Sequence, residues 1–332
     1  PGEFKRLLLS KANAQEHIIM SSAGPNGKAS WSAFSDAKAW LYRPDLLPQF
    51  INWCEGLKMN RFIRDLLRTV RIPSVDVPES TQLHLGRIHT FEEWGGKTRH
   101  VAIVDYWTQL ILTPLHDTIF EYLNGITMDA THDQDAACAT IRAWTQNEKA
   151  ELNCYDLTAA TDRLPLVLQT RVLSVLLGSE SLAANWAHIL IDREYATANS
   201  SFVSYAVGAP MGSKSNWAML ALLHHLIIQH ASLEAGYTAP YVSYRVCGDD
   251  SVINGNAVSN AYVSIMSALG LEINTFKSVL HGTSLLPAAE FCKRLFISGV
   301  EYTVLPVKLL AKTVMNGRLA PQLQSEMTRR YL

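Results

Sequence analysis

The stretch from Tyr241 to Asn254, YVSYRVCGDDSVIN, constrains the fold of this chain more than any other. β-Branched and aromatic residues alternate with polar ones before Gly248, and more β-branched residues follow, which predicts two strands that meet at a tight turn. Gly248 supplies the bend, and Asp249 and Asp250 stand side by side at its tip. Neighbouring carboxylates repel unless solvent, a cation or a donor compensates them. The hairpin therefore predicts either a metal site or an ordinary solvated Gly-Asp turn.

At 332 residues the chain is long enough for one large domain or two. Hydrophobic residues make up 48% of it and charged residues 18%, which is typical of a globular protein and not of a disordered one. The net charge of −1 provides no overall field that would attract a polyanion. If the partner is a nucleic acid, we expect the basic residues that bind it to be clustered locally.

The cysteines are odd in number and form no Cys-x-x-Cys pair, so we expect reduced core residues of an intracellular protein. They are Cys54, Cys138, Cys154, Cys247 and Cys292. No apolar run of about 18 residues predicts a membrane span, and no signal-peptide pattern is present. Since the sequence begins Pro1-Gly2 without Met, we expect a fragment or a chain with an altered N-terminus.

Four arginines recur at helical spacing, with apolar residues on the opposite side: Arg61, Arg64, Arg68 and Arg71. This pattern predicts an amphipathic helix with a basic stripe. A solvated face explains such a stripe, and contact with an RNA backbone is the alternative.

The segment 95–109, GGKTRHVAIVDYWTQ, places two glycines ahead of a basic stretch and an apolar strand. Alternation along an extended chain puts Lys97 and Arg99 on the same side. Two adjacent cations suit a polyphosphate, although basic residues at the start of a strand are common. Apolar residues then recur at helical spacing over 107–123 and 136–149.

The segment 151–165, ELNCYDLTAATDRLP, predicts a strand in which Asp156 ends a buried row that also contains Leu152 and Cys154. A carboxylate at the end of a core strand usually has a reason to be there. Asp162 follows near the start of an apolar helix. It is therefore either a helix N-cap or a residue that contacts substrate.

The segment 204–217, SYAVGAPMGSKSNW, is a loop that leads into an apolar helix over 218–233. Its glycines, Gly208 and Gly212, would let the backbone approach a ligand closely. Three short polar residues lie at the start of the helix, where N-capping alone would explain one of them. These are Ser213, Ser215 and Asn216.

The histidines of this helix, His224, His225 and His230, have no carboxylate at ligand spacing, so we expect them to pack or hydrogen-bond locally. Beyond the first hairpin, a helix is expected over 258–269 and a short strand before Lys277. Residues 290–305, EFCKRLFISGVEYTVL, predict a second hairpin that turns at Ser298-Gly299.

In this order the segments resemble the motifs of viral RNA-dependent RNA polymerases, and within that group the mitoviruses, close to the narnaviruses. GGKTRHVAIVDYWTQ is similar to the basic fingers motif, DLTAATDRLP to the first palm motif, GAPMGSKSNWAMLALLHH to the second and CGDD to the third. GLEINTFKS resembles the lysine-bearing fourth motif and EFCKRLF the fifth. The resemblance covers about two thirds of the chain.

The resemblance implies an α+β right-hand polymerase with an antiparallel-sheet palm packed on helices, helical fingers and a truncated thumb. The fingers would occupy 1–150, and the palm 151–289 with a fingers insertion around 170–205. The palm-thumb hairpin and the start of the thumb would follow over 290–332. The implied function is template-directed RNA synthesis from ribonucleoside triphosphates, which replicates a viral RNA genome in the host mitochondrion.

The resemblance also assigns roles to residues. Asp156 and Asp249, with Asp250 in support, would hold two Mg²⁺ or Mn²⁺ ions if their strands are neighbours in one antiparallel sheet. Lys97 and Arg99 would clamp the triphosphate. Lys277 is a candidate general acid for the departing pyrophosphate.

Asp162, with Ser213 or Asn216, would sense the ribose 2′-hydroxyl. Family members tend to carry Ser-Ser before the tryptophan of the second motif, whereas this chain has Ser215-Asn216. This departure leaves open which side chain contacts the ribose.

Two alternatives stand beside this interpretation. Reverse transcriptases share the palm fold and paired aspartates, but they usually place an aromatic and a variable residue where this chain has Cys247-Gly248. An endogenised viral fragment could bind RNA without doing chemistry. No expected catalytic residue is missing from the sequence, which argues against such a relic.

Overall fold

The computed structural model describes residues 1–28, 31–72, 82–93, 96–274, 278–303 and 307–331. The chain forms two compact units: unit 1 is Pro1–Gly125 with Ala159–Leu223, and unit 2 is Ile126–Thr158 with His224–Leu332. These boundaries differ from those expected for fingers and palm, since unit 2 begins at 126 and not at 151, and all of 159–223 belongs to unit 1. The names fingers, palm and thumb stay predictions for the ranges given above.

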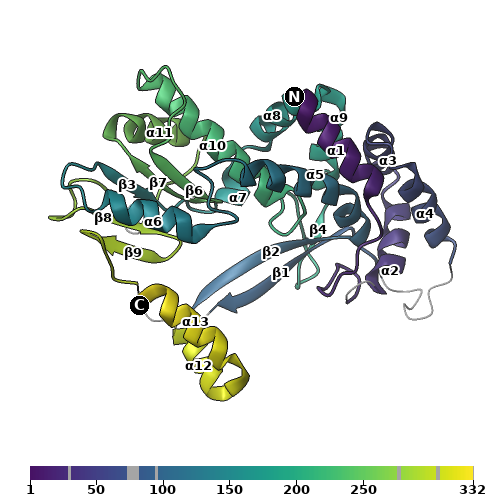
Figure 1. Ribbon diagram of the computed structural model, residues 1–332. Coiled ribbons are helices and arrows are strands. Elements are labelled where there is room, and N and C mark those ends of the chain that lie inside the picture. The colour runs from purple at the N-terminus through teal and green to yellow at the C-terminus, as the bar shows by residue number, and fades with distance from the viewer. Residues whose placement is uncertain (29–30, 73–81, 94–95, 275–277, 304–306, 332) are drawn as a thin grey trace. The chain divides into compact units, whose positions relative to one another are not determined.

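Unit 1 is mainly helical (Figure 1). Its helical segments are α1 (Gly2–Ala14), α2 (Ser32–Ala39), η2 (Trp40–Tyr42), α3 (Leu47–Gly56), α4 (Asn60–Val70), α5 (Tyr106–Asn124), α7 (Ala160–Arg163), α8 (Leu166–Leu177) and α9 (Glu180–Ile191). The division between the units falls within α10 (Asn216–Glu234). A sheet in the order β2-β1-β4-β5 comprises β1 (Gly86–Glu93), β2 (Lys97–Val104), β4 (Tyr195–Ala196) and β5 (Phe202–Val203).

A buried ion pair fixes the core of unit 1 at the start of α5. The Arg193 guanidinium lies 2.7 Å from the Asp105 carboxylate, and both side chains are fully enclosed. Asp105 also accepts hydrogen bonds from the Thr108 backbone and the Trp40 indole. Arg193 donates further to the Leu85 carbonyl and the Thr108 hydroxyl. Buried charges need such additional hydrogen bonds to offset the cost of leaving water.

Unit 2 is built on two small antiparallel sheets (Figure 1). One has the order β3-β7-β6, from β3 (Leu152–Tyr155), β7 (Asp250–Asn254) and β6 (Tyr244–Cys247). The other has the order β10-β9-β8, from β8 (Ala288–Phe291), β9 (Arg294–Ile297) and β10 (Val300–Glu301). The helical segments are α6 (Gln134–Trp144), α11 (Asn256–Ala268), α12 (Val307–Met315), η3 (Gly317–Leu319) and α13 (Ala320–Tyr331).

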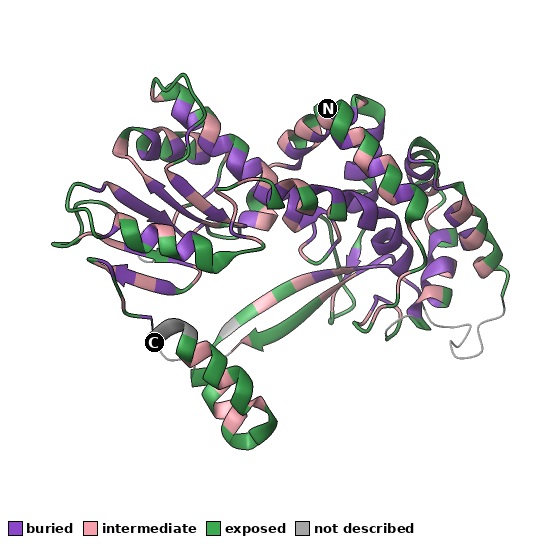
Figure 2. Cartoon of the chain, viewed as in Figure 1, coloured by how far each residue is buried: buried purple, intermediate pink, exposed green. Residues whose placement is uncertain are grey.

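The core of unit 2 lies between its strands and two helices. Helix α11 packs on β3 and β7, while α6 contacts β6, β8 and β9. Apolar side chains of both sheets and α6 form one buried cluster, which includes Ile141, Val252 and Phe296. Figure 2 shows β3, β7 and β6 largely buried, whereas α12 and α13 are mostly exposed. The α+β class expected from the sequence is confirmed.

Most predicted elements are present. The arginine-bearing helix is α4, the helix expected over 107–123 is α5, and that expected over 218–233 is α10. The helix expected over 136–149 ends earlier, at Trp144, since Thr145 bonds back to the Ile141 carbonyl as its C-cap. The hairpin expected to turn at Ser298-Gly299 is formed by β9 and β10. The loop expected over 73–81 lies outside the described residues.

Candidate active site

The three-stranded sheet of unit 2 brings together two segments that lie far apart in the sequence. Strand β3 pairs with β7 in antiparallel register, with Tyr155 opposite Ser251. Asp156 follows β3 directly, and Asp250 is the first residue of β7. The next step of the same register therefore places Asp156 alongside Asp250. The expected adjacency of these two strands is confirmed.

The hairpin between β6 and β7 has a two-residue loop. Cys247 pairs with Asp250, which leaves Gly248 and Asp249 between the strands. Gly248 has φ +64, a conformation that glycine adopts without strain and that suits the first position of a tight hairpin turn. Asp249 is exposed, whereas Asp250 is half-buried. The two aspartates therefore differ in environment although they are neighbours.

Carboxylates are crowded at this end of the sheet. Burial, together with the negative charges of Asp249, Asp156 and Glu290, raises the pKa of Asp250 to about 6. The positive charge of Lys293 lowers the pKa of Asp250, but by less than the acidic groups raise it. Such mutual repulsion among acidic groups is the condition that a divalent cation relieves.

A pocket of about 520 Å³ opens beside these carboxylates in unit 2. It lies against β3, β7 and the turn between β8 and β9. Its polar wall combines acidic side chains with two thiols, three hydroxyl groups and an amine. The residues with polar side chains that line it are Cys154, Tyr155, Asp156, Asp250, Ser251, Ser278, Glu290, Cys292 and Lys293. Of these residues, the sequence predicts only Asp156 and Asp250 as members of the site. Ser278, Glu290, Cys292 and Lys293 reach the pocket through long-range contacts, which local patterns do not indicate.

A histidine on α10 supports the hairpin loop from within unit 2. His224 is buried, and its Nδ1 lies 2.8 Å from the Gly248 carbonyl oxygen. A carbonyl only accepts, so Nδ1 carries the proton, and Nε2 accepts from the Tyr262 hydroxyl at 2.8 Å. Burial lowers the pKa of His224 to about 4, which keeps the ring neutral. The loop is therefore positioned by a hydrogen-bonded residue that no local sequence pattern indicates.

The other two histidines of α10 also form contacts within the fold, but each has a carboxylate partner, which differs from the expectation. His225 contacts the Tyr244 hydroxyl and the Asp129 carboxylate, both at 2.9 Å. His230 lies 3.4 Å from Glu234, one turn further along the helix.

One thiol of the pocket wall, that of Cys292, lies beside the thiol of Cys247. Cys247 ends β6, and Cys292 lies in the turn between β8 and β9. Their side chains form a hydrogen bond, and this bond lowers the pKa of Cys247.

The basic residues expected to bind triphosphate lie in unit 1. Lys97 is the first residue of β2, and Arg99 is opposite Phe91 in the β1-β2 pair. Arg99 forms an ion pair with Glu93 at 2.8 Å. A polyphosphate bound by Arg99 would have to compete with this carboxylate.

Asp162 is not a helix N-cap. It lies inside the short helix α7, where Ala159 is the N-cap, and α8 is preceded by Pro165 without a side-chain cap. Burial raises the pKa of Asp162, and a hydrogen bond from the Tyr205 hydroxyl partly opposes this shift. The capping alternative is therefore wrong.

The loop glycines allow close approach of the chain to itself. A Cβ on Gly208 would lie 2.4 Å from the Thr161 carbonyl oxygen, and one on Gly212 would lie 2.7 Å from that of Ala102. Gly212 also has φ +114. Close packing of unit 1 thus explains both glycines without a ligand.

The three polar residues at the start of α10 are all buried. Ser213 donates to the Pro210 carbonyl, and Ser215 accepts from the Trp186 indole at 2.9 Å. The Asn216 amide also donates to the Pro210 carbonyl, at 2.7 Å, while its Oδ1 has no hydrogen-bond partner in the described part of the chain. Among the three, only Asn216 therefore retains a buried acceptor without a partner.

Lys277 lies outside the described residues, as does the side chain of Lys97. Among the residues that the structure describes, no three or more His, Cys, Asp or Glu side chains form a ready-made metal cage. A site of this kind fits a hard cation that takes one or two protein carboxylates and completes its shell with water or phosphate.

The predicted basic stripe is present on α4. Arg64, Arg68 and Arg71 are exposed, and the Arg61 guanidinium lies 4.8 Å from the centre of the Phe62 ring. Asp65 approaches Arg68 only to 4.0 Å. Within the described ranges, Arg64 and Arg71 have no carboxylate partner.

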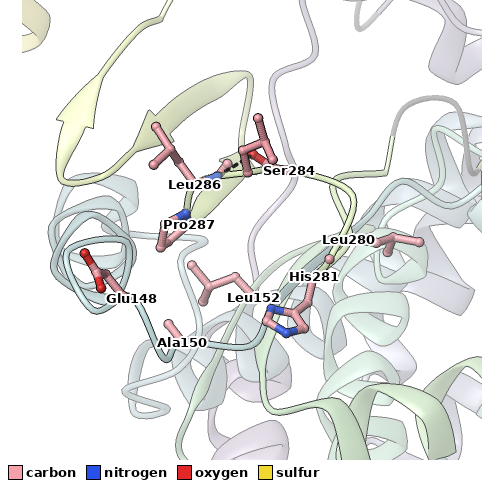
Figure 3. A pocket seen from close by; sticks show the side chains of 11 residues that line it. Glu148, Ala150, Leu152, Leu280, His281, Ser284, Leu286 and Pro287 are labelled. Atoms are coloured by element: carbon pink, nitrogen blue, oxygen red, sulfur yellow. Dashed lines mark hydrogen bonds between the residues drawn. The ribbon is translucent and has the colours of Figure 1, made fainter.

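A second pocket of unit 2, of about 190 Å³, lies between the 148–152 segment and the loop before β8 (Figure 3). Glu148 and His281 are its ionisable residues, beside Leu286 and Pro287. None of the predicted site residues lines it.

The fold is similar to that of solved nucleic-acid polymerases. The chain resembles an insertion-loop deletion mutant of the RNA-dependent RNA polymerase of a human picobirnavirus with a TM-score of 0.51 and 18% identity, over 65% of this chain and 45% of that one. It resembles telomerase from Candida albicans with a TM-score of 0.51 and 11% identity, over 77% and 56%. Since the fold is common to both enzymes, it does not by itself separate RNA polymerase from reverse transcriptase.

The family to which the sequence belongs distinguishes between these two classes of enzyme. The model of the mitovirus RNA-dependent RNA polymerase matches residues 10–331, so the chain belongs to this family. The RNA-directed RNA polymerase of Cryphonectria parasitica mitovirus 1 is 33% identical over 282 residues, which cover 82% of this chain and 34% of that protein. An uncharacterized mitochondrial protein of Arabidopsis thaliana is 31% identical over 59% of this chain and 77% of its own length.

The chain thus spans about a third of the length of that viral polymerase. In the part that the structure describes, no helix is both long and apolar enough to cross a membrane.

Proposed function

We propose that this chain is the core of an RNA-directed RNA polymerase that copies a viral RNA genome from ribonucleoside triphosphates. The observation that carries the proposal is the antiparallel pairing of β3 with β7, which brings Asp156 to the hairpin that bears Asp249 and Asp250. Family membership supports the same activity.

The carboxylates of Asp156, Asp249 and Asp250 would hold two Mg²⁺ or Mn²⁺ ions. Their oxygen donors suit hard cations, and the raised pKa of Asp250 indicates the negative potential that such ions relieve. When bound, the ions supply charge stabilisation for the attacking and leaving oxygens of an in-line displacement. The protein's own part is to fix the carboxylates, which it does through the register of the sheet and through His224.

Residues of unit 1 would bind the incoming nucleotide. Lys97 and Arg99 would contact its phosphates, with Arg99 exchanging Glu93 for phosphate oxygens. Asp162 and Asn216 would recognise the ribose, and the unpaired Oδ1 of Asn216 favours it over Ser213 and Ser215, whose hydroxyls already have partners. Lys277 would donate a proton to the leaving pyrophosphate.

RNA template and nascent RNA would be the partners. The stripe on α4 would contact phosphates, because its arginines are exposed and the apolar side of the helix, with Phe62 and Leu66, is already buried. The host mitochondrion is the proposed location, supported by the family and by the mitochondrial relatives in Arabidopsis thaliana.

The decisive assay measures incorporation on one RNA template by a chain of the length of the viral relative. Ribonucleotide incorporation that requires Mg²⁺ and exceeds deoxyribonucleotide incorporation is the expected result. Preference for deoxyribonucleotides would identify a reverse transcriptase. RNA binding without any elongation would identify a relic.

A further inference from the structure

Two of the five cysteines differ from the others in position and exposure. Cys54, Cys138 and Cys154 are buried, with at most 3% of their surface exposed. Cys247 and Cys292 are partly exposed, and both pack against the core of unit 2. A side-chain hydrogen bond joins Cys247 to Cys292, and both pack against the same buried cluster.

This contact joins the end of β6 to the turn between β8 and β9, which lie more than forty residues apart in the sequence. Cys247 pairs with Asp250 in the hairpin of the candidate active site. Cys292, with φ 51, and Lys293, with φ 63, form the turn between β8 and β9, and both line the larger pocket. A covalent bond between the sulfurs would tie this pocket wall to the strand that precedes Gly248 and Asp249.

We propose that Cys247 and Cys292 form an oxidisable pair, and that a peroxide converts them to a disulfide that controls the candidate active site. The control of the site rests on the proposed polymerase function, whereas formation of the bond does not. Partial exposure gives a small oxidant access to these thiols, and their contact supplies the second thiol at once.

The reaction balances with hydrogen peroxide as the oxidant. The Cys247 sulfur attacks one peroxide oxygen, the O–O bond breaks, and water leaves with the thiol proton, which gives a sulfenic acid. The Cys292 sulfur then attacks the Cys247 sulfur and the S–O bond breaks. The hydroxyl leaves as a second water with the Cys292 proton. Two thiols are oxidised by two electrons, and one peroxide is reduced to two waters.

Formation of the disulfide requires the sulfurs to approach to about 2.05 Å. Cys138 is the competing partner, because its side chain lies near Cys292 in the same cluster. Cys138 is only 1% exposed, so an oxidant has poorer access to it than to Cys247. The structure therefore favours the pair 247–292 over 138–292.

Peptide mapping tests the bond without any activity assay. The whole chain is treated with hydrogen peroxide, its remaining thiols are alkylated, and a non-reducing digest is analysed by mass spectrometry. The expected product is a peptide pair linked through Cys247 and Cys292, which dithiothreitol separates. The same link should survive in Cys54→Ser and be lost in Cys247→Ser. Full alkylation of both thiols in the peroxide-treated wild type, or a link to Cys138, would overturn the proposal.

A second arm tests control of the site in the longer, active chain. Peroxide should abolish ribonucleotide incorporation in the wild type, and dithiothreitol should restore it. In Cys247→Ser, the activity after peroxide should stay close to the activity after dithiothreitol. If the wild type forms the disulfide and retains its activity, the proposal that the disulfide controls the candidate active site is wrong. If no chain shows activity, the proposed function fails and the mapping result still decides the bond.

Discussion

At the scale of single residues, Asp250 differs from a surface carboxylate because it is half-buried and surrounded by other negative charges. Burial and three neighbouring negative charges raise its pKa to about 6. Below that pH the carboxyl is largely protonated and has less capacity to bind a cation. Metal binding therefore competes with protons in an accessible range of pH.

Because the raised pKa favours the neutral acid, we expect Mn²⁺ affinity to fall as the pH is lowered from about 7.5 to about 5 through this pKa. Calorimetric titration at both pH values measures the change. Asp250→Asn cannot ionise, so it should bind more weakly at the higher pH and show a smaller pH dependence. Equal pH dependence in the wild type and in this variant would contradict the assignment of Asp250.

Gly208 tests the finding that the loop glycines serve packing. Gly208→Ala places a methyl group 2.4 Å from the Thr161 carbonyl oxygen, so it should destabilise the protein by about 1–3 kcal/mol. Urea unfolding measures the loss. Gly317→Ala is the control, since a Cβ there meets nothing within 4 Å. Equal stability of the two variants would refute the packing role.

At the scale of elements, His224 connects α10 to the turn of the hairpin. His224 donates to the Gly248 carbonyl and accepts from Tyr262 on α11. The positions of the loop and of two helices in unit 2 are coupled by these bonds.

His224→Ala leaves a carbonyl and a hydroxyl without partners in a buried site, which should cost about 2–4 kcal/mol of unfolding free energy. His230→Ala on the same helix removes only a half-exposed contact and should change stability by about 0.5 kcal/mol or less. Urea denaturation compares them. Similar losses in both variants would exclude a special role for His224.

The basic stripe on α4 makes a quantitative prediction about salt. Replacing Arg64 and Arg71 by Gln should reduce the slope of log affinity for single-stranded RNA against log salt by about 0.7 for each phosphate that is no longer neutralised. The slope is measured by fluorescence anisotropy at several salt concentrations. The control replaces Arg6 and Arg171, exposed arginines of α1 and α8. An unchanged slope would leave the stripe as a solvated face.

At the scale of the whole molecule, the order of local patterns predicts more than any one pattern does. The hairpin, the Asp156 strand and the amphipathic helices depend on nearby residues, so alternation, helical spacing and glycine placement are enough to predict them. Asp162 shows the limit of such patterns, because its half-buried position depends on the 205–208 segment folding back onto α7.

The same limit applies to the candidate site. Glu290, Cys292 and Lys293 line the pocket because a second sheet packs beside the first, and this packing has no signature in the sequence around them. Cys247 and Cys292 likewise come together only when both sheets are formed. Patterns of local sequence therefore predict the strands and the aspartates, whereas the wall opposite them requires the structure.

The most direct test of the central claim is Mg²⁺-dependent ribonucleotide incorporation by the longer chain and by its Asp249→Ala variant. Asp117→Ala, which removes an exposed carboxylate from α5, is the matched control. We predict that Asp249→Ala abolishes incorporation while Asp117→Ala retains it and both remain folded. Unchanged incorporation in Asp249→Ala would contradict the assignment of this hairpin as the metal site of a polymerase.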